Sequence, residues 1–105
     1  MSAAPKRLRL DQGAPLVALP RSGRMVLGSD AERADVMLAG AGVEPVHCTI
    51  GRVKGGGFAL QDLGTDAGTL VNGQRITAVR LTVGDVIEIG SRRIEVEGDV
   101  EPPKP

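Results

Sequence analysis

Residues 62–73 read DLGTDAGTLVNG, and loop chemistry alternates with strand chemistry within this segment. Asn72 and Gly73 stand between two short strand-like runs, and both residue types tolerate the positive φ angles that a two-residue type I′ turn requires. The pair therefore predicts a tight hairpin between the runs that flank it. Upstream, Gly64 and Gly68 bracket a polar run that follows an apolar stretch, which predicts an exposed loop between two strands. This loop is a candidate recognition surface.

The pattern of the whole chain favours an all-β sandwich. Short apolar runs recur with turn signals between them, the chain contains 15 glycines, and no apolar period of 3.6 residues persists. Residues 7–10 alternate Arg with Leu and are predicted to form an edge strand. The domain is expected to span residues 7–97, between a flexible N-terminal tail at 1–6 and a Pro-rich tail or linker at 98–105.

Composition argues against membrane insertion and secretion. The 105 residues contain no apolar run long enough to span a bilayer. Polar residues and prolines interrupt the segment after the first basic residues, so a signal peptide is not expected. Cys48 is the only cysteine, which agrees with a reducing compartment. We therefore expect a cytoplasmic protein.

Charge and residue types also exclude several kinds of site. Thirteen basic and thirteen acidic residues cancel, and Phe58 is the only aromatic residue, so a nucleic-acid partner is not expected. His47 is the only histidine, and with one cysteine it supplies no metal-ligand set. We expect His47 to be buried and to brace a loop, and Cys48 to be a small core residue. No nucleophile–base pair is present, so neither catalysis nor a cofactor is expected.

A series of motifs in order along the chain resembles the forkhead-associated (FHA) domain, over roughly residues 16–97. The motifs are Gly28, residues 35–38, residues 43–47 with Ile50, residues 62–65, Gly68-Thr69, residues 71–73, Leu81, residues 84–87 and Ile89-Gly90. The resemblance implies a sandwich of two antiparallel sheets with ten to eleven short strands. It also implies that loops at one end bind protein segments containing phosphothreonine. Such a site needs a cation with hydroxyl and amide donors to hold the phosphate dianion.

The chain departs from the family pattern at the positions that hold the phosphopeptide. Members that bind phosphothreonine usually carry Arg after the glycine, where this chain has Ser29. The serine of the family corresponds to Glu44, the following basic or amide residue to Pro45, and the asparagine before Gly-Thr to Ala67. The positions that match the peptide-binding face are Ser29, Glu44, Pro45, Thr65, Asp66 and Ala67. The residues retained with a structural role are Gly28, His47, Gly68, Thr69, Asn72 and Gly73.

The size of these losses predicts a non-functional phosphothreonine pocket. Each charge-assisted hydrogen bond contributes roughly 1.5–3 kcal/mol. A carboxylate about 5 Å from a phosphate adds roughly 3 kcal/mol of repulsion per unit charge at an effective dielectric constant of about 20. A micromolar complex has a binding free energy of only about 8 kcal/mol.

Two binding functions follow. The first is a phosphorylation-independent protein-interaction module, in a signalling or assembly context that the resemblance implies. The alternative is a phosphothreonine-binding module that uses substitute cations near the same loops, for which Arg24, Arg33 and Arg52 are the candidates. Both functions have a protein partner and need no metal or cofactor.

Overall fold

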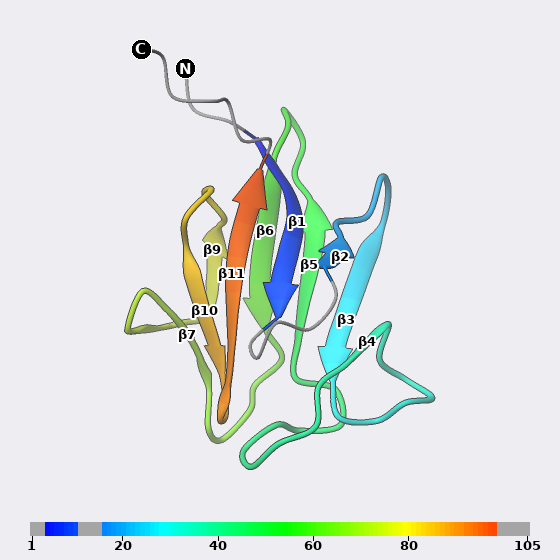
Figure 1. Cartoon of the computed structure of the whole chain (residues 1–105), viewed down its shortest axis with the longest axis vertical. Helices are drawn as coiled ribbons and strands as arrows, with labels where there is room; N and C mark the ends of the chain where they lie inside the picture. The colour runs from blue at the N-terminus through cyan, green and yellow to red at the C-terminus, as the bar shows by residue number, and fades with distance from the viewer. Residues whose placement is uncertain (1–3, 11–15, 99–105) are drawn as a thin grey trace.

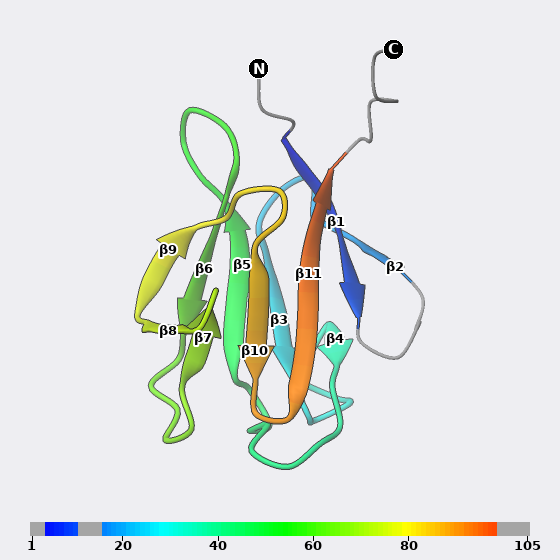
Figure 2. The same ribbon diagram turned by 60° about the vertical axis from the view of Figure 1, so that its left-hand side comes forward.

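Two β-sheets pack face to face in the computed structural model, which describes residues 4–10 and 16–98 (Figures 1 and 2). The first sheet has six strands in the order β2-β1-β11-β10-β7-β8. Its strands are β1 (Pro5–Leu10), β2 (Leu16–Ala18), β7 (Thr69–Val71), β8 (Gln74–Ile76), β10 (Val86–Ile89) and β11 (Arg92–Gly98). The second sheet has five strands in the order β4-β3-β5-β6-β9. Its strands are β3 (Arg24–Gly28), β4 (Val36–Met37), β5 (Cys48–Arg52), β6 (Phe58–Asp62) and β9 (Ala78–Arg80).

The predicted all-β sandwich is confirmed, with one difference in strand direction. The described residues form eleven strands and no helix. Every strand pair is antiparallel except β3 with β4, which is parallel over Leu27–Val36 and Gly28–Met37. The parallel pair arises because the chain leaves β3, makes a loop and returns beside it in the same direction. No helix among the described residues is long and apolar enough to cross a membrane.

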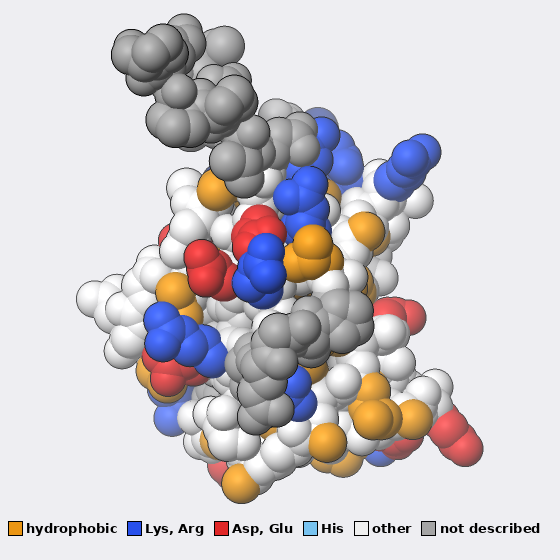
Figure 3. All heavy atoms as spheres, viewed as in Figure 1, with side chains coloured by type: hydrophobic (Ala, Val, Ile, Leu, Met, Phe, Trp, Pro, Cys, Tyr) orange, Lys and Arg blue, Asp and Glu red, His pale blue; other side chains and the backbone are white. Residues whose placement is uncertain are grey.

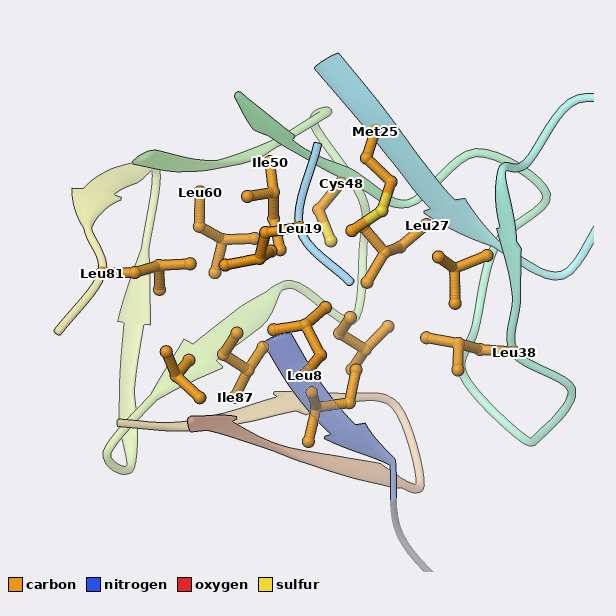
Figure 4. Packing of buried hydrophobic residues seen from close by; sticks show 14 of the residues in the cluster. Leu8, Leu19, Met25, Leu27, Leu38, Cys48, Ile50, Leu60, Leu81 and Ile87 are labelled. Atoms are coloured by element: carbon orange, nitrogen blue, oxygen red, sulfur yellow. The ribbon is translucent and has the colours of Figure 1, made fainter. Parts of the chain in front are cut away.

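The core lies between the sheets and follows from the alternation along each strand. In β11, Ile94 and Val96 are buried while the residues beside them face outward. Figure 4 shows Leu8 and Ile87 of the first sheet facing Ile50 and Leu60 of the second. All of these side chains are almost fully buried. Removing this apolar area from water is the main stabilising contribution to the fold.

The predicted hairpin at Asn72-Gly73 is confirmed. Leu70 pairs with Arg75 on the adjacent strand, and the two turn residues have φ angles of 53° and 84°. The Asn72 side chain also holds the start of β10, because its Nδ2 donates to Asp85 Oδ1 at 2.9 Å and its Oδ1 accepts from the Val86 amide at 3.0 Å. The turn thus fastens the hairpin to its own sheet.

The prediction that residues 7–10 form an edge strand is wrong. This segment belongs to β1, which begins at Pro5 and pairs with β2 on one side and β11 on the other. The strand β2, which pairs with the outer edge of β1, has only three residues. A run this short does not identify a strand, or its pairing partner, from the sequence alone. Residues 1–3 and 99–105 of the predicted tails lie outside the described residues.

Candidate functional site

Three loops meet at one end of the sandwich, at the bottom of Figure 1. They follow β3, precede β5 and follow β6, so the ends of three neighbouring strands of the second sheet fix their origins. β1 begins and β11 ends at the opposite end of the molecule. On the side drawn in Figure 3, the surface of the loop end is largely uncharged.

Gly28 lets the first loop lie directly against the second. A Cβ at this position would stand 2.1 Å from the carbonyl oxygen of Pro45, so only glycine fits without moving backbone. The close approach lets the Ser29 amide donate to the Glu44 carbonyl at 2.9 Å and the Asp30 amide donate to the Pro45 carbonyl at 3.2 Å. Ser29 is therefore held by its backbone, and its short side chain presents only a hydroxyl.

His47 connects the second loop to the third. The ring is fully buried, its Nδ1 accepts from the Glu44 amide at 3.2 Å, and its Nε2 donates to the Gly68 carbonyl at 2.9 Å. An accepting Nδ1 carries no proton, so these bonds select the neutral tautomer with hydrogen on Nε2. His47 therefore holds the second and third loops together from a buried position.

Asp62 organises the third loop from the end of β6. Its carboxylate accepts from the hydroxyls of Thr65 at 2.7 Å and Thr69 at 2.8 Å, and from the amides of Gly64 at 2.9 Å and Thr65 at 3.1 Å. Burial by itself raises the pKa of Asp62, but these hydrogen bonds outweigh it and hold the pKa below its ordinary value of 3.8. Thr65 in turn accepts from the Gly68 amide at 3.0 Å. The loop is therefore built around an ionised carboxylate.

Glu44 joins the second and third loops at the surface. Its Oε2 accepts from the Asp66 amide at 3.0 Å, and its side chain is half-buried. Asp66 and Ala67 themselves are exposed. An amide donor on the candidate peptide-binding face is thus already engaged by a carboxylate of the same chain.

The structure brings one of the three candidate substitute cations to the loop end. Arg33 lies in the first loop, where its Nε donates to Asp30 Oδ2 at 2.7 Å and both side chains are partly or largely exposed. Hydrogen bonds from the Glu32 backbone and from Arg33 lower the pKa of Asp30. Arg24 and Arg52 lie at the other ends of β3 and β5, about 13 Å along each strand from the loops.

Arg75 is a cation at the loop end that the sequence analysis did not select. Its Nη2 donates to the carbonyls of Thr65 at 3.1 Å and Asp66 at 3.2 Å, and its side chain covers Gly68 so closely that a Cβ there would lie 2.5 Å from Nε. The signal was present in the hairpin, whose register pairs Arg75 with Leu70, two residues from Gly68.

The described residues contain no group suited to metal binding, since no three His, Cys, Asp or Glu side chains come together among them. Cys48 is fully buried in β5, and burial together with the Asp62 charge raises the pKa of its thiol to about 12. A protonated, inaccessible thiol is a core group rather than a nucleophile. What this end of the molecule offers is a surface of loop amides and hydroxyls, which suits binding.

Comparisons with known proteins agree with this geometry. A scan against protein-family models matches residues 25–90 to the FHA domain, and a comparison with curated protein sequences finds no match. The FHA domain of CT664 from Chlamydia trachomatis has a TM-score of 0.83 at 20% identity, over 92% of this chain and 100% of that chain.

Two other solved FHA domains are more similar in sequence. The FhaA FHA domain, complexed with the intracellular domain of Rv3910, has a TM-score of 0.78 at 34% identity, over 87% of this chain and 98% of that chain. A domain from work on phosphothreonine-dependent FHA interactions has a TM-score of 0.80 at 32% identity, over 95% of this chain and 100% of that chain. With more than half of its length matched, the chain belongs to the FHA domain family, whose members are protein-interaction modules that usually bind phosphothreonine peptides.

Proposed function

We propose that this FHA domain binds a partner protein without requiring phosphorylation, in a cytoplasmic signalling or assembly context. The observation that carries the proposal is the hydrogen bond from the Asp66 amide to Glu44 Oε2, at 3.0 Å. The carboxylate supplies, within the chain, the negative charge that a phosphate would bring to this amide.

Electrostatics supports the proposal. A phosphate seated at the Asp66 amide would lie about 5 Å from Glu44, and repulsion at that distance is roughly 3 kcal/mol per unit charge at an effective dielectric constant of about 20. Ser29 offers no cation against this, and its amide is already bound to the Glu44 carbonyl. Ala67 has no side-chain amide with which to hold a peptide backbone. The cation at Ser29, the hydroxyl at Glu44 and the side-chain amide at Ala67 are thus missing, and the Glu44 carboxylate adds a repulsive contact.

Phosphothreonine binding through substitute cations is the second candidate. Arg33 and Arg75 are the guanidinium groups that support it, since both are exposed at the loop end. Each has an existing partner, because Arg33 binds Asp30 and Arg75 binds the carbonyls of the third loop. A phosphate would have to take these groups from their partners, which reduces the free energy available for binding.

A peptide titration separates the two candidates. The domain is titrated with a degenerate phosphothreonine peptide library and with the same library unphosphorylated, and binding is read by fluorescence anisotropy. We expect no saturable, phosphate-dependent binding below about 10 µM, which corresponds to roughly 7 kcal/mol. The triple variant Ser29→Arg, Glu44→Ser, Ala67→Asn should gain phosphate-dependent binding by at least about tenfold, because it restores a cation, a hydroxyl and an amide.

Single variants decide which contact matters. Glu44→Gln keeps an acceptor oxygen for the Asp66 amide but removes the charge, so it isolates the repulsion. Phosphate-dependent binding by the unmodified domain, lost in Arg33→Ala or Arg75→Ala, would establish the second candidate and reject the first.

A further inference from the structure

A cluster of cations lies at the end of the sandwich opposite the loops. Two neighbouring hollows adjoin it, of about 370 Å³ and about 140 Å³, and the Arg52 side chain borders both. The smaller hollow continues along the outer face of the second sheet as far as Thr49 and Gln61. The larger is also lined by Lys6 and Arg21, and the smaller by Arg24. We call the three arginines, Arg21, Arg24 and Arg52, the basic rim. Figure 3 shows Lys and Arg side chains gathered at this upper end of the molecule.

The described residues that line the two hollows include no Asp or Glu to offset the basic rim. The chain as a whole, in contrast, has thirteen acidic residues against thirteen basic ones. Elsewhere in the described part of the chain, arginines do form ion pairs, as Arg9 does with Glu97 and Arg33 with Asp30. Among the described residues, no ion pair neutralises Arg24 or Arg52. Among the described residues, the three arginines of the rim are therefore a local excess of positive charge.

The floor of the smaller hollow allows a backbone to come close. It is the outer face of the second sheet, where Gly51 pairs with Ala59 and Gln61 pairs with Ala78, so three of the four side chains are a methyl group or a hydrogen atom. Gln61, together with Thr49 beside it, provides hydrogen-bonding groups on that floor. An extended peptide fits such a trough better than a bulky ligand does.

The chemistry favours an acidic peptide over a nucleic acid. Base stacking needs an exposed aromatic face, whereas Phe58 is only 6% exposed and the Arg52 guanidinium lies over its ring at 5.3 Å from the centroid. A protein segment rich in Asp and Glu requires only the charge and the trough. We propose that the basic rim is a second docking surface, which binds an acidic, extended segment of a partner protein. It goes beyond the proposed function, since it uses a different surface and needs no assumption about the loop end.

A defined acidic peptide tests the surface directly. The probe is a fluorescein-labelled twelve-residue peptide of alternating Glu and Ala, with an alternating Gln and Ala peptide as its uncharged control. In a buffer of low salt we expect saturable binding of the Glu peptide that is at least about tenfold tighter than that of the control, and that weakens at least about tenfold at 0.5 M salt. In ¹⁵N-edited spectra, the amides of Gly51, Ala59 and Ala78 should shift, while those of Ser29 and Asp66 should not.

Matched variants assign the binding to the rim. Arg24→Glu should weaken the Glu peptide at least tenfold, whereas Arg93→Glu, which makes the same change of net charge on the other sheet, should change it less than twofold. Thermal unfolding shows whether Arg24→Glu is folded. If it is not, Arg52→Gln serves as a second test, because it keeps an aliphatic stem over Phe58 and removes the charge. Equal binding of the Glu peptide to the wild type and to the folded rim variants would overturn the proposal.

Two further results would also overturn it. One is equal affinity for the Glu and Gln peptides, and the other is tighter binding of a thymidine oligonucleotide of matched charge than of the Glu peptide. Because the probe contains no phosphate, its failure leaves the proposed function intact. Phosphothreonine-dependent binding at the loops would reject the proposed function, but it would leave the proposal about the basic rim intact.

Discussion

Gly28 is the residue on which the geometry of the loop end depends most directly. A methyl group there would stand 2.1 Å from the Pro45 carbonyl oxygen and 2.7 Å from its carbon, and both are backbone atoms that cannot rotate away. We expect Gly28→Ala to destabilise the domain by about 1–3 kcal/mol, the usual cost of forcing an atom into a packed site. Urea unfolding monitored by circular dichroism measures the difference.

Gly51 provides the control for this substitution. It is also a strand glycine without a positive φ, but the nearest atom to its added Cβ is the Arg24 Cγ, at 3.2 Å, on a flexible side chain. Gly51→Ala should therefore cost less than about 1 kcal/mol, because the arginine can move aside. Similar losses in the two variants would mean that the contact with Pro45 does not determine the need for glycine at position 28.

Single residues also mark the limit of what could be predicted at the site. The positions of Ser29, Glu44 and Ala67 on a candidate binding face followed from motif spacing. The bond between Glu44 and the Asp66 amide did not, because it joins groups 22 residues apart whose loops meet only in the folded chain. Arg24 and Arg52 were selected for closeness in sequence to the loops, yet strand direction carries them to the far end.

At the scale of elements, the β7–β8 hairpin has a stabilising role beyond its own two strands. Asn72 adopts φ 53° and its side chain makes two hydrogen bonds to the start of β10, with Asp85 and Val86. We expect Asn72→Ala to cost about 2–4 kcal/mol, from the left-handed conformation of a residue with a plain Cβ and from two lost hydrogen bonds. The free energy of unfolding in urea is the measurement.

Asn72→Gly separates the two contributions. Glycine keeps the freedom to adopt positive φ but makes neither side-chain bond, so we expect it to retain about 1 kcal/mol that the alanine variant loses. A glycine variant as stable as the wild type would contradict the role of the bonds to β10. A glycine variant no more stable than the alanine variant would contradict the cost assigned to the backbone angle.

The elements show why strands were easier to predict than their pairing. Alternation and turn residues are local, so the hairpin and most strands could be identified from the sequence. Pairing depends on segments far apart in the chain, and two predictions failed for that reason. The predicted edge strand β1 pairs with the three-residue β2, and in a sheet expected to be antiparallel β4 lies parallel to β3 over two residue pairs.

The whole molecule separates its two candidate surfaces. The loops lie at one end of the sandwich, while β1 begins and β11 ends at the other, where the basic rim also lies (Figure 1). A partner on the loops would therefore leave the arginines of the rim accessible. Arg24 and Arg52 of the rim stand about 13 Å from the loops along β3 and β5.

Stability against acid is a property of the whole sandwich, and Asp62 should contribute to it because its carboxylate bonds Thr69 of the other sheet. Since the pKa of Asp62 is lowered in the folded chain, the unfolded chain takes up this proton more readily, and acid favours unfolding. The stabilisation is present at neutral pH and is lost as the pH falls below about 5 and through the folded pKa. We expect the melting temperature of the wild type to drop steadily over this window. Asp62→Asn should melt at a lower temperature than the wild type at pH 7, and its melting temperature should fall less on acidification. If the melting temperatures of the two proteins fell in parallel as the pH is lowered, the acid sensitivity would belong to other carboxylates.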